Sequence, residues 1–163
     1  MDINLQQASR THIIALQDIF VKSISVLCTS DYSPEQRNAW LMGVHNQLRW
    51  NALIASQYVV MANCNNQPAG FISVNYNEYI DMLYVHPDYA HKGVASSLLN
   101  HVIAFAVGNR VEKMATHASK TALPFFQKNG FTMISVNNVT RYQVPLVNYY
   151  MERKLIGEKL NAD

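Results

Sequence analysis

The sequence predicts an α/β (α+β) fold in which helices come first and a sheet follows. Apolar residues recur at helical spacing between residues 11 and 56. From Tyr58 onward, β-rich runs alternate with turn residues, and two further helical segments lie between later strands. The chain has 163 residues, a length that suits one domain, so we expect residues 1–163 to form a single α/β domain.

The N-terminal part is expected to hold one short strand and three helices. Thr11 is the candidate N-cap of the first helix. Ser33 precedes Pro34, and Gln36 supplies the side chain of a capping box, so a second helix is expected to begin there. The expected elements are a strand at 3–8 and helices at 11–28, 34–44 and 46–56.

The rest of the chain is expected to alternate between strands and helices. A turn is expected from Asn63 to Gln67, closed by Pro68-Ala69-Gly70, and Gly130 suits the position that follows a helix. Beyond Leu155 we expect a fraying extension. The expected strands cover 58–62, 71–76, 78–85, 112–118, 131–139 and 145–154, and the expected helices cover 93–107 and 119–129.

Composition and charge argue against several classes of protein. The formal net charge is only +2, and the chain lacks the basic stripe of a nucleic-acid-binding surface. No stretch approaches the roughly 20 apolar residues that span a bilayer, and the N-terminus lacks the pattern of a secretory signal. Cys28 and Cys64 are expected to be reduced, buried thiols, and the 6 histidines show no metal-binding spacing. We therefore expect a cytoplasmic protein with no metal and no nucleic-acid or membrane partner.

The segment from Tyr79 to Leu99 carries the most chemical information. A strand runs into a short loop, and Gly93 then opens a helix. The start of a helix leaves several backbone N–H groups without internal partners and carries about half a positive charge, so it can bind a diphosphate. Gly93 has no Cβ to obstruct the phosphates, and Lys92 adds a nearby cation. The glycine patterns of a Walker loop and of a dinucleotide fingerprint are missing, and an ordinary strand-to-helix turn is the alternative.

Two blocks of sequence, separated by one helix and one strand, suggest a family. The first is Leu83-Tyr84-Val85-His86-Pro87-Asp88-Tyr89 followed by Gly93 and Ala95, and the second is Ala122-Leu123-Pro124-Phe125-Phe126-Gln127-Lys128-Asn129-Gly130-Phe131. The first resembles motif A of the GCN5-related N-acetyltransferases (the GNAT superfamily), and the second resembles a later helix and strand start of that family. With Asp31-Tyr32-Ser33-Pro34-Glu35-Gln36, the chain looks closest to the bacterial YafP-like subgroup.

The resemblance implies a fold and an activity. The GNAT fold has a central mixed, mostly antiparallel twisted sheet of about seven strands, flanked by helices and splayed between strands four and five. The implied activity is transfer of an acetyl group from acetyl-coenzyme A to a primary amine of a small molecule or peptide, by direct attack. The resemblance places coenzyme A against Leu83, Tyr84, Val85, His91, Lys92, Gly93, Val94, Ala95, Ser96, Ser119, Phe125 and Phe126.

Catalytic roles are expected for a few side chains. Asp81 is the favoured base, since strand alternation puts Tyr79, Asp81 and Leu83 on one face; a structural acceptor or a substrate anchor is the alternative. Tyr84 lies near the expected splay, where a backbone N–H would stabilise the oxyanion. The candidates for the general acid, which would protonate the departing thiolate, are Tyr142, Tyr149 and Tyr79. His117 is a further candidate for a catalytic group, and Ser119 is a candidate helix cap. Trp40 and Trp50 are expected either in the core or in an acceptor pocket.

The sequence departs from the family's pattern at two positions. Ala90 stands where a Gln or Arg is usual, so one contact to the diphosphate is missing. Phe126 stands where many relatives have the tyrosine that protonates the departing thiolate. These departures keep open a coenzyme A-binding module without turnover. Two further alternatives are a transferase for a longer acyl group, since the sequence does not define the size of the acyl pocket, and a nucleic-acid-binding module, which only the overall basicity supports. The acceptor and the oligomeric state are not readable, although dimers are common in this superfamily.

Overall fold

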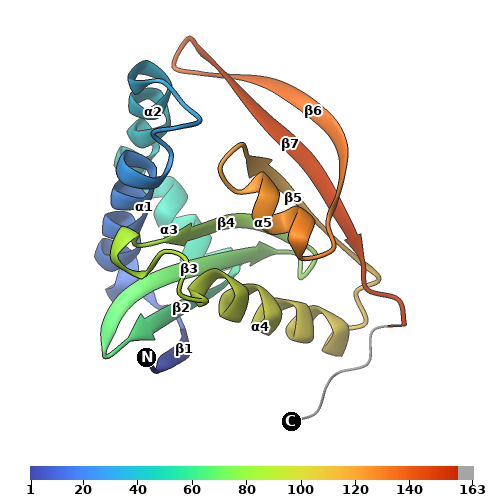
Figure 1. Cartoon of the computed structure of the whole chain (residues 1–163). Coiled ribbons are helices and arrows are strands. Elements are labelled where there is room, and N and C mark those ends of the chain that lie inside the picture. Colours follow the sequence, from blue (N-terminus) through green and yellow to red (C-terminus); the bar gives the residue numbers. More distant parts are fainter. Residues whose placement is uncertain (158–163) are drawn as a thin grey trace.

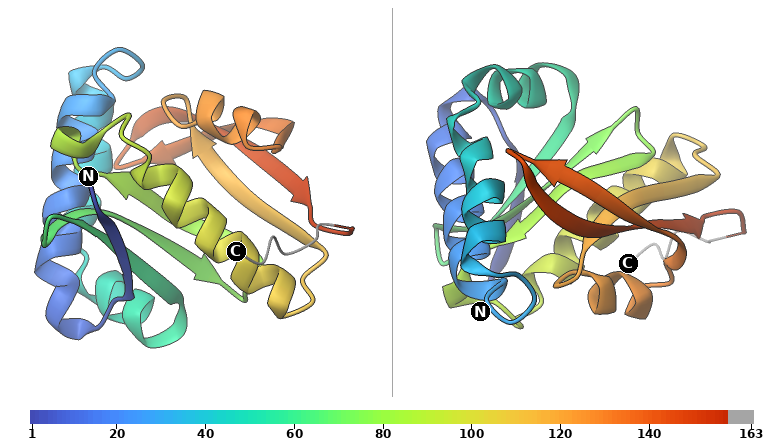
Figure 2. Two further views of the ribbon diagram at one scale, coloured as in Figure 1. Left: turned by 60° about the horizontal axis from the view of Figure 1, so that its bottom comes forward. Right: turned by 90° about the horizontal axis from the view of Figure 1, so that it is seen from above.

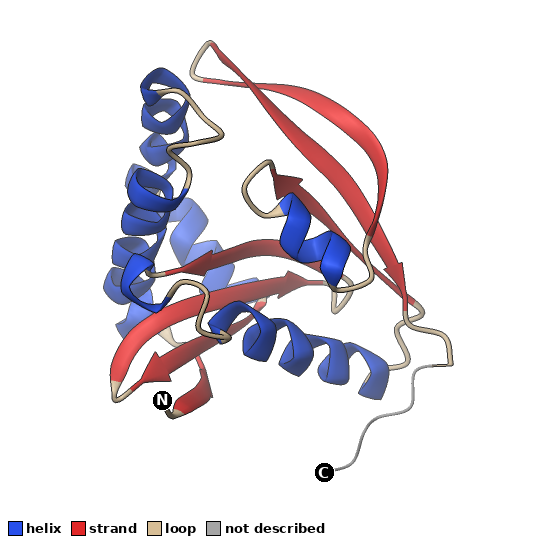
Figure 3. Ribbon diagram, viewed as in Figure 1, coloured by secondary structure: helices blue, strands red, loops and turns tan. Residues whose placement is uncertain are grey.

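The computed structural model describes residues 1–157 as one seven-stranded sheet with helices against it (Figures 1 and 3). The strands are β1 (Ile3–Gln7), β2 (Tyr58–Cys64), β3 (Gln67–Asn75), β4 (Tyr79–Val85), β5 (Lys113–Ser119), β6 (Thr132–Arg141) and β7 (Val144–Lys154). The α-helices are α1 (Ile13–Leu27), α2 (Pro34–Leu41), α3 (Gln47–Ser56), α4 (Val94–Gly108) and α5 (Leu123–Lys128). Short 3-10 turns cover Arg10–His12, Met42–His45 and Pro87–Tyr89.

The strands follow the order β1-β2-β3-β4-β5-β7-β6. Every neighbouring pair is antiparallel except β4 and β5, which run parallel. A parallel pair needs a crossover connection, and α4 provides it between β4 and β5. The expected mixed, mostly antiparallel sheet is confirmed.

Two apolar cores lie on the two faces of the sheet. α4 and α5 pack on one face, where Ile72, Ile80 and Leu98 are fully buried. α1 and α3 pack on the other, around Phe71 and Trp50. Figure 2 shows α4 crossing its face of the sheet while α1 lies at the opposite side. The position of both helix layers follows from the alternation of side chains along β2 and β3, which sends neighbours to opposite cores.

Helix and turn boundaries differ from expectation at a few places. Ser33 caps α2 as expected, because its Oγ accepts from the Gln36 N–H at 3.1 Å. Thr11 does not cap α1, which begins at Ile13 after a 3-10 turn. The β2–β3 turn is shorter than expected: Asn65 and Asn66 adopt positive φ, and Pro68 to Gly70 lie within β3. Most of the extension expected beyond Leu155 lies outside the described residues.

β4 separates from β5 soon after it begins. The two strands pair only at Tyr79–Ala115 and Ile80–Thr116, so the edge of β4 that faces β5 is open beyond Ile80. This separation is the splay expected between strands four and five. The open edge carries backbone N–H and C=O groups that an extended ligand could pair with.

A β-bulge at Asp81 changes which way the following side chains point. Val74 of β3 pairs with Ile80 and Ser73 pairs with Met82, so Asp81 is the extra residue. Ile80 and Leu83 belong to the α4 core, whereas Met82 belongs to the α1 core. The expectation that Leu83 shares a face with Asp81 is therefore wrong, because the extra residue reverses the alternation.

Gly70 lets the start of α4 lie close to the sheet. A Cβ at this position would lie 2.9 Å from Val94 Cγ1 and 3.0 Å from the Tyr84 carbonyl oxygen. The absence of a side chain therefore allows the first turn of α4 to pack directly beside the end of β4. Within residues 1–157, none of the helices is long and apolar enough to cross a membrane.

Candidate functional site

The first turn of α4 presents unpaired backbone N–H groups. Gly93 is its N-cap with φ +88°, a left-handed conformation that glycine adopts without strain. The Ser97 N–H donates to the Gly93 carbonyl at 3.0 Å, which closes the first helical turn. The N–H groups before Ser97 consequently have no partner inside the helix, and they add to the positive end of the helix dipole. A Cβ at Gly93 would meet no atom within 4 Å. The left-handed backbone conformation, and not a lack of space, therefore accounts for a glycine at this position.

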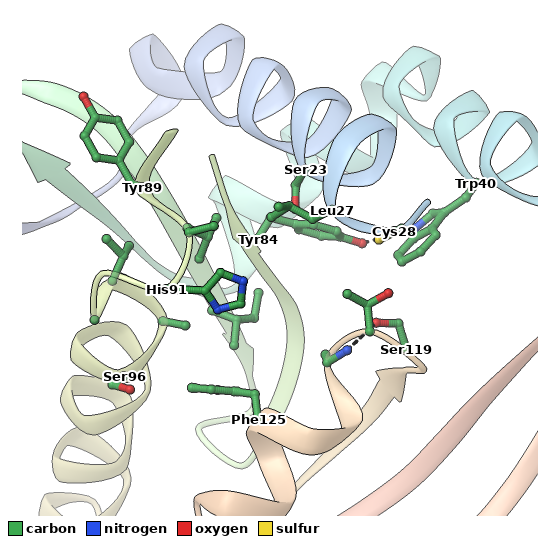
Figure 4. A pocket seen from close by; sticks show the side chains of 18 residues that line it. Ser23, Leu27, Cys28, Trp40, Tyr84, Tyr89, His91, Ser96, Ser119 and Phe125 are labelled. Carbon is green, nitrogen blue, oxygen red and sulfur yellow. Dashed lines mark hydrogen bonds between the residues drawn. The ribbon is translucent and has the colours of Figure 1, made fainter. Parts of the chain in front are cut away.

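A cavity of about 280 Å³ opens in front of this helix start (Figure 4). Its walls come from α1, the end of β4, the loop before α4, and α5. The lining has far more apolar than polar character, with Leu27, Val85 and Phe125 among its members. It brings together most of the residues predicted to bind coenzyme A: Leu83, Tyr84, Val85, His91, Gly93, Val94, Ala95, Ser96, Ser119 and Phe125.

Three predicted site residues lie elsewhere. The Lys92 ammonium donates a hydrogen bond to the backbone carbonyl of Asp88 at 2.8 Å, and Lys92 does not line the cavity. Phe126 is 2% exposed and packs between Phe125 and Phe131; it lines neither this cavity nor the second one described below, but a third space of about 60 Å³ that it shares with Tyr84 and Ser119. Tyr142 lies at the tip of the β6–β7 hairpin and is 62% exposed.

A second, smaller cavity of about 120 Å³ adjoins the first. Trp40, Tyr84 and Ser119 line both cavities, so the two spaces meet at these residues. The β6–β7 hairpin forms the outer wall of the second cavity and lies against α2 (Figure 1). Its remaining lining residues are Tyr32, Tyr79, Asp81, His117, Val139, Arg141, Leu146, Val147 and Asn148.

Contacts from the N-terminal helices hold the hairpin in place. The Tyr32 hydroxyl donates to the Val147 carbonyl at 2.9 Å, and the Gln36 amide donates to the Pro145 carbonyl at 3.0 Å. Leu146 packs with Tyr32 and Cys28 in a small apolar cluster. The second cavity is therefore enclosed by segments that lie far apart in the sequence.

Asp81 lies at the wall of the second cavity, where its carboxylate accepts several hydrogen bonds. Its carboxylate accepts from Arg49 Nη2 at 3.3 and 3.4 Å and from Gln57 Nε2 at 2.9 Å. The side chain is 16% exposed, so part of the carboxylate remains open to the cavity. These hydrogen bonds occupy both carboxylate oxygens, which suits an anchor for an ammonium better than a base. The catalytic role of Asp81 stays a prediction.

Tyr79 and His117 form a hydrogen-bonded pair in the same cavity. The Tyr79 hydroxyl and His117 Nδ1 are 2.7 Å apart, and they project from β4 and β5 near the point where these strands separate. Burial raises the pKa of Tyr79, and the charge of Asp81 raises it further. A neutral phenol next to an imidazole can pass a proton to it.

Tyr84 lies where the two cavities meet. Trp40 Nε1 donates to the Tyr84 hydroxyl at 3.2 Å, and Figure 4 shows this hydroxyl pointing toward Trp40 and Cys28. Burial raises the pKa of Tyr84 well above its ordinary value. Tyr84 therefore stays neutral and can donate a hydrogen bond into the junction.

The structure also places the other candidates. Ser119 Oγ accepts from the Ala122 N–H at 3.1 Å within the turn before α5 (Figure 4), but the helix begins at Leu123 with Ala122 as its N-cap, so Ser119 is not the helix cap that was expected. Trp50 is 1% exposed and belongs to the core, whereas Trp40 lines both cavities. Tyr149 packs against the α4 core and lines neither cavity.

Sequence reasoning missed several residues of the second cavity and its surroundings. Arg49 and Gln57 reach Asp81 from α3 and from the residue that follows it, and Arg141 and Asn148 reach the cavity from the hairpin. No local pattern marks these residues, because only the packing of distant elements brings them together. A polar Asn148 between Val147 and Tyr149 in a strand is the one weak signal.

Comparison with known proteins identifies the family. The model of the acetyltransferase (GNAT) domain matches residues 28–153. The N-acetyltransferase YafP of Escherichia coli (strain K12) is 36% identical over 136 residues, which cover 83% of this chain and 85% of YafP. A GCN5-related N-acetyltransferase from Rhodopseudomonas palustris has a structure with TM-score 0.91 at 30% identity, and the match covers 94% of this chain and 96% of that one.

A more distant structure shares the fold alone. The yncA protein of Salmonella typhimurium, solved with its cofactor acetyl-CoA, superposes with TM-score 0.68 at 17% identity, and the match covers 100% of this chain and 99% of that one. The family match, the relative at 36% identity and the sheet that splays between β4 and β5 agree with one another. The chain belongs to the GNAT family of acetyltransferases.

Proposed function

We propose that the protein transfers an acetyl group from acetyl-coenzyme A to a primary amine. The observation that carries this proposal is the meeting of two cavities at Tyr84, one beside the start of α4 and one lined by Asp81 and His117. Two reactants bound in adjoining spaces react with a smaller entropic barrier than two that must meet in solution. Membership of the GNAT family supports the same activity.

The large cavity suits the donor. The free N–H groups from Gly93 to Ser96 and the helix dipole favour an anionic diphosphate. The open edge of β4 beside Leu83 and Val85 can pair with the amides of the pantetheine arm as an added strand would. Ala90 lines the cavity, but its methyl group cannot form a hydrogen bond with a phosphate. In this proposal, backbone N–H groups therefore bind the diphosphate.

The second cavity suits the acceptor. The carboxylate of Asp81 attracts an ammonium, which must lose a proton before it can attack. In our proposal the proton passes to the Tyr79 hydroxyl while Tyr79 gives its own proton to His117 Nδ1, across their 2.7 Å contact. Asp81 acts as anchor in this scheme, because Arg49 and Gln57 already donate to both of its carboxylate oxygens.

The amine then attacks the thioester carbonyl at the junction of the cavities. A C–N bond forms, and the carbonyl oxygen becomes an oxyanion that a backbone N–H on the open edge of β4 can stabilise. As the C–S bond breaks, coenzyme A leaves as a thiolate, and the attacking nitrogen, which still carries one proton more than the amide product, releases that proton to solvent water. Phe126 has no proton to give and lies in the core, and a thiolate is stable enough near neutral pH to leave without one.

An acceptor screen tests this function. Purified protein is mixed with acetyl-coenzyme A and a panel of amines, and released thiol is measured. We expect amine-dependent release, lowered by Asp81→Asn mainly through a higher KM for the amine, about tenfold or more. Asp18→Asn is the matched control, because Asp18 pairs with Lys22 on the exposed side of α1.

The screen also separates the alternatives. Coenzyme A binding without amine-dependent thiol release for any acceptor would support a binding module and contradict the proposed function. Faster release from longer acyl donors would identify a different acyltransferase. Unchanged kinetics in Asp81→Asn would remove Asp81 from acceptor binding.

A further inference from the structure

We propose that the acceptor is a free amino acid or a similar small amine that carries its own carboxylate. This inference rests on the proposed function and names the substrate class for the second cavity. Three observations carry it: opposite charges on the cavity wall, a buried amide oxygen of Asn148 without a partner in the described residues, and hydrogen bonds that hold the β6–β7 hairpin, which carries Arg141 and Asn148, over the cavity.

The second cavity has a carboxylate and a guanidinium among its lining residues. Asp81 projects from β4, and Arg141 ends β6. The ion-pair partner of Asp81 is Arg49, and none of the ion pairs found within residues 1–157 includes Arg141. The two opposite charges therefore do not neutralise each other. A zwitterion with its ammonium toward Asp81 and its carboxylate toward Arg141 complements both.

Arg141 faces the cavity and not only the solvent. Its positive charge favours the ionised form of Tyr84 and so acts against the increase in pKa that burial causes there. Arg141 also lines the second cavity together with Tyr84, which is the observation that places it beside the junction. Arg141 also precedes a tight turn in which Tyr142 and Gln143 both have positive φ, which fixes the end of β6.

Asn148 supplies a hydrogen-bond acceptor that has no partner in the described chain. Its Oδ1 atom is buried, and no donor within residues 1–157 reaches it. Asn148 pairs in register with Ser119, which lines both cavities, so it lies near the junction. A buried acceptor without a donor is costly, and an N–H of a bound amine would satisfy it.

The size of the cavity and its aromatic walls limit the acceptor further. The volume is about 120 Å³, and rings of Tyr32, Trp40 and Tyr79 line it. The N-terminal residue of a peptide has an amide where a free amino acid has a carboxylate, and so would leave Arg141 without an anion. The cavity thus favours a free amino acid over a peptide.

Matched pairs of acceptors test the inference. Thiol release from acetyl-coenzyme A is measured with alanine and ethylamine, phenylalanine and phenethylamine, and lysine and cadaverine. We expect kcat/KM to be about tenfold or more higher for at least one amino acid than for its decarboxylated partner. A preference for the decarboxylated partner in every pair, or no preference, would overturn the inference.

A variant assigns the preference to Arg141. Arg141→Gln should bring the ratio within the preferred pair close to one, mainly by raising KM for the amino acid. Arg110→Gln is the control, because Arg110 lies in the turn after α4 and does not line the cavity. A preference that survives in Arg141→Gln would contradict the role of Arg141, and the comparison in the unaltered protein does not depend on how this variant folds.

The two proposals fail differently. If no amine releases thiol although coenzyme A binds, the proposed function fails. If amines release thiol without any preference for a carboxylate, the proposed function stands and the amino-acid inference fails.

Discussion

Asp81 and His117 line the same cavity but have different neighbours. Asp81 accepts hydrogen bonds from Arg49 and Gln57. His117 Nδ1 lies 2.7 Å from the Tyr79 hydroxyl, and none of the ion pairs found among the described residues includes His117, whereas Asp81 pairs with Arg49. This difference suggests a division of work in which the carboxylate binds the acceptor and the imidazole takes its proton.

Removing the proton acceptor should lower the rate of chemistry. We expect His117→Gln to reduce kcat about a hundredfold, because a positioned general base contributes that order of rate. Tyr79→Phe should have a similar effect, since it interrupts the path to Nδ1. Steady-state kinetics measure kcat, and calorimetry should show unchanged affinity for acetyl-coenzyme A.

A second tyrosine–histidine pair provides the control. Tyr58 and His101 are joined by a 2.9 Å hydrogen bond and line neither cavity. His101→Gln should leave kcat unchanged. An equal loss in both histidine variants would indicate a general structural effect and contradict the proton-transfer role of His117.

Residue roles that depend on local sequence could be predicted in part. Ser33 caps α2 as expected, because a cap needs only a partner three residues away, whereas Thr11 and Ser119 do not cap the helices expected of them. The ion pair of Asp81 with Arg49 could not be predicted, since 32 residues separate the two and only the packing of α3 beside β4 joins them. The same limit hid Arg141 and Asn148.

At the scale of elements, the start of α4 determines where an anion can bind. Gly93 adopts φ +88°, so the backbone enters the helix from a left-handed residue. Gly70 has no side chain, so the first turn of α4 lies close against β3 and β4. A Cβ at this position would collide with Val94 and with the Tyr84 carbonyl oxygen. Gly93 therefore determines the direction in which α4 begins, and Gly70 determines how close its first turn lies to the sheet.

A substitution at Gly93 should weaken cofactor binding. Gly93→Ala places a Cβ on a left-handed residue, which costs about 1 kcal/mol and shifts the first turn. We expect lower affinity for coenzyme A by calorimetry together with a slightly lower free energy of unfolding.

Gly108 in the same helix is the control. A Cβ added to Gly108 would meet no atom within 4 Å, and the residue does not have a positive φ. Gly108→Ala should stabilise the helix by up to about 1 kcal/mol without changing the affinity for coenzyme A. Unchanged coenzyme A affinity in Gly93→Ala would contradict the importance of this helix start.

Elements with a strong periodic pattern were predicted well. All seven expected strands exist, and the splay between β4 and β5 is present. The bulge at Asp81 was not foreseen, because a single extra residue leaves no mark in the alternation of apolar side chains until the partner strand is known. The sequence prediction starts this strand at Phe71, because Pro68 indicates a turn. β3 begins at Gln67 instead, since proline is tolerated at the start of a strand.

At the scale of the whole molecule, the strand order produces the acceptor cavity. β7 lies between β5 and β6, and so the β6–β7 hairpin projects beyond the sheet toward α2 (Figures 1 and 2). Tyr32 and Gln36 then bind the hairpin to the N-terminal helices. The family resemblance predicted the sheet, whereas the cavity arises from this long-range closure. The single domain over residues 1–163 stays a prediction.

Several buried acidic groups near the junction should make the fold sensitive to alkali. Burial raises the pKa of Cys28 above its ordinary 9.0 and the pKa values of Tyr32 and Tyr84 above 10.0. The folded state thus holds these protons more tightly than the unfolded state. Stability is full below about pH 9 and falls as pH rises through the raised folded values.

Urea unfolding at increasing pH measures this effect. We expect the free energy of unfolding to fall by about 1 kcal/mol or more between about pH 8 and about pH 11. Tyr84→Phe has no phenol to ionise and should show a smaller fall. A free energy of unfolding that stays constant or rises over this range would contradict the burial of these groups.

The central claim is that the start of α4 binds the diphosphate of coenzyme A. The most direct test is a crystal structure of the protein with coenzyme A bound. The account predicts the diphosphate within hydrogen-bond distance of the N–H groups between Gly93 and Ser96, with the pantetheine arm along Leu83 to Val85. A diphosphate bound anywhere else on the protein would contradict it.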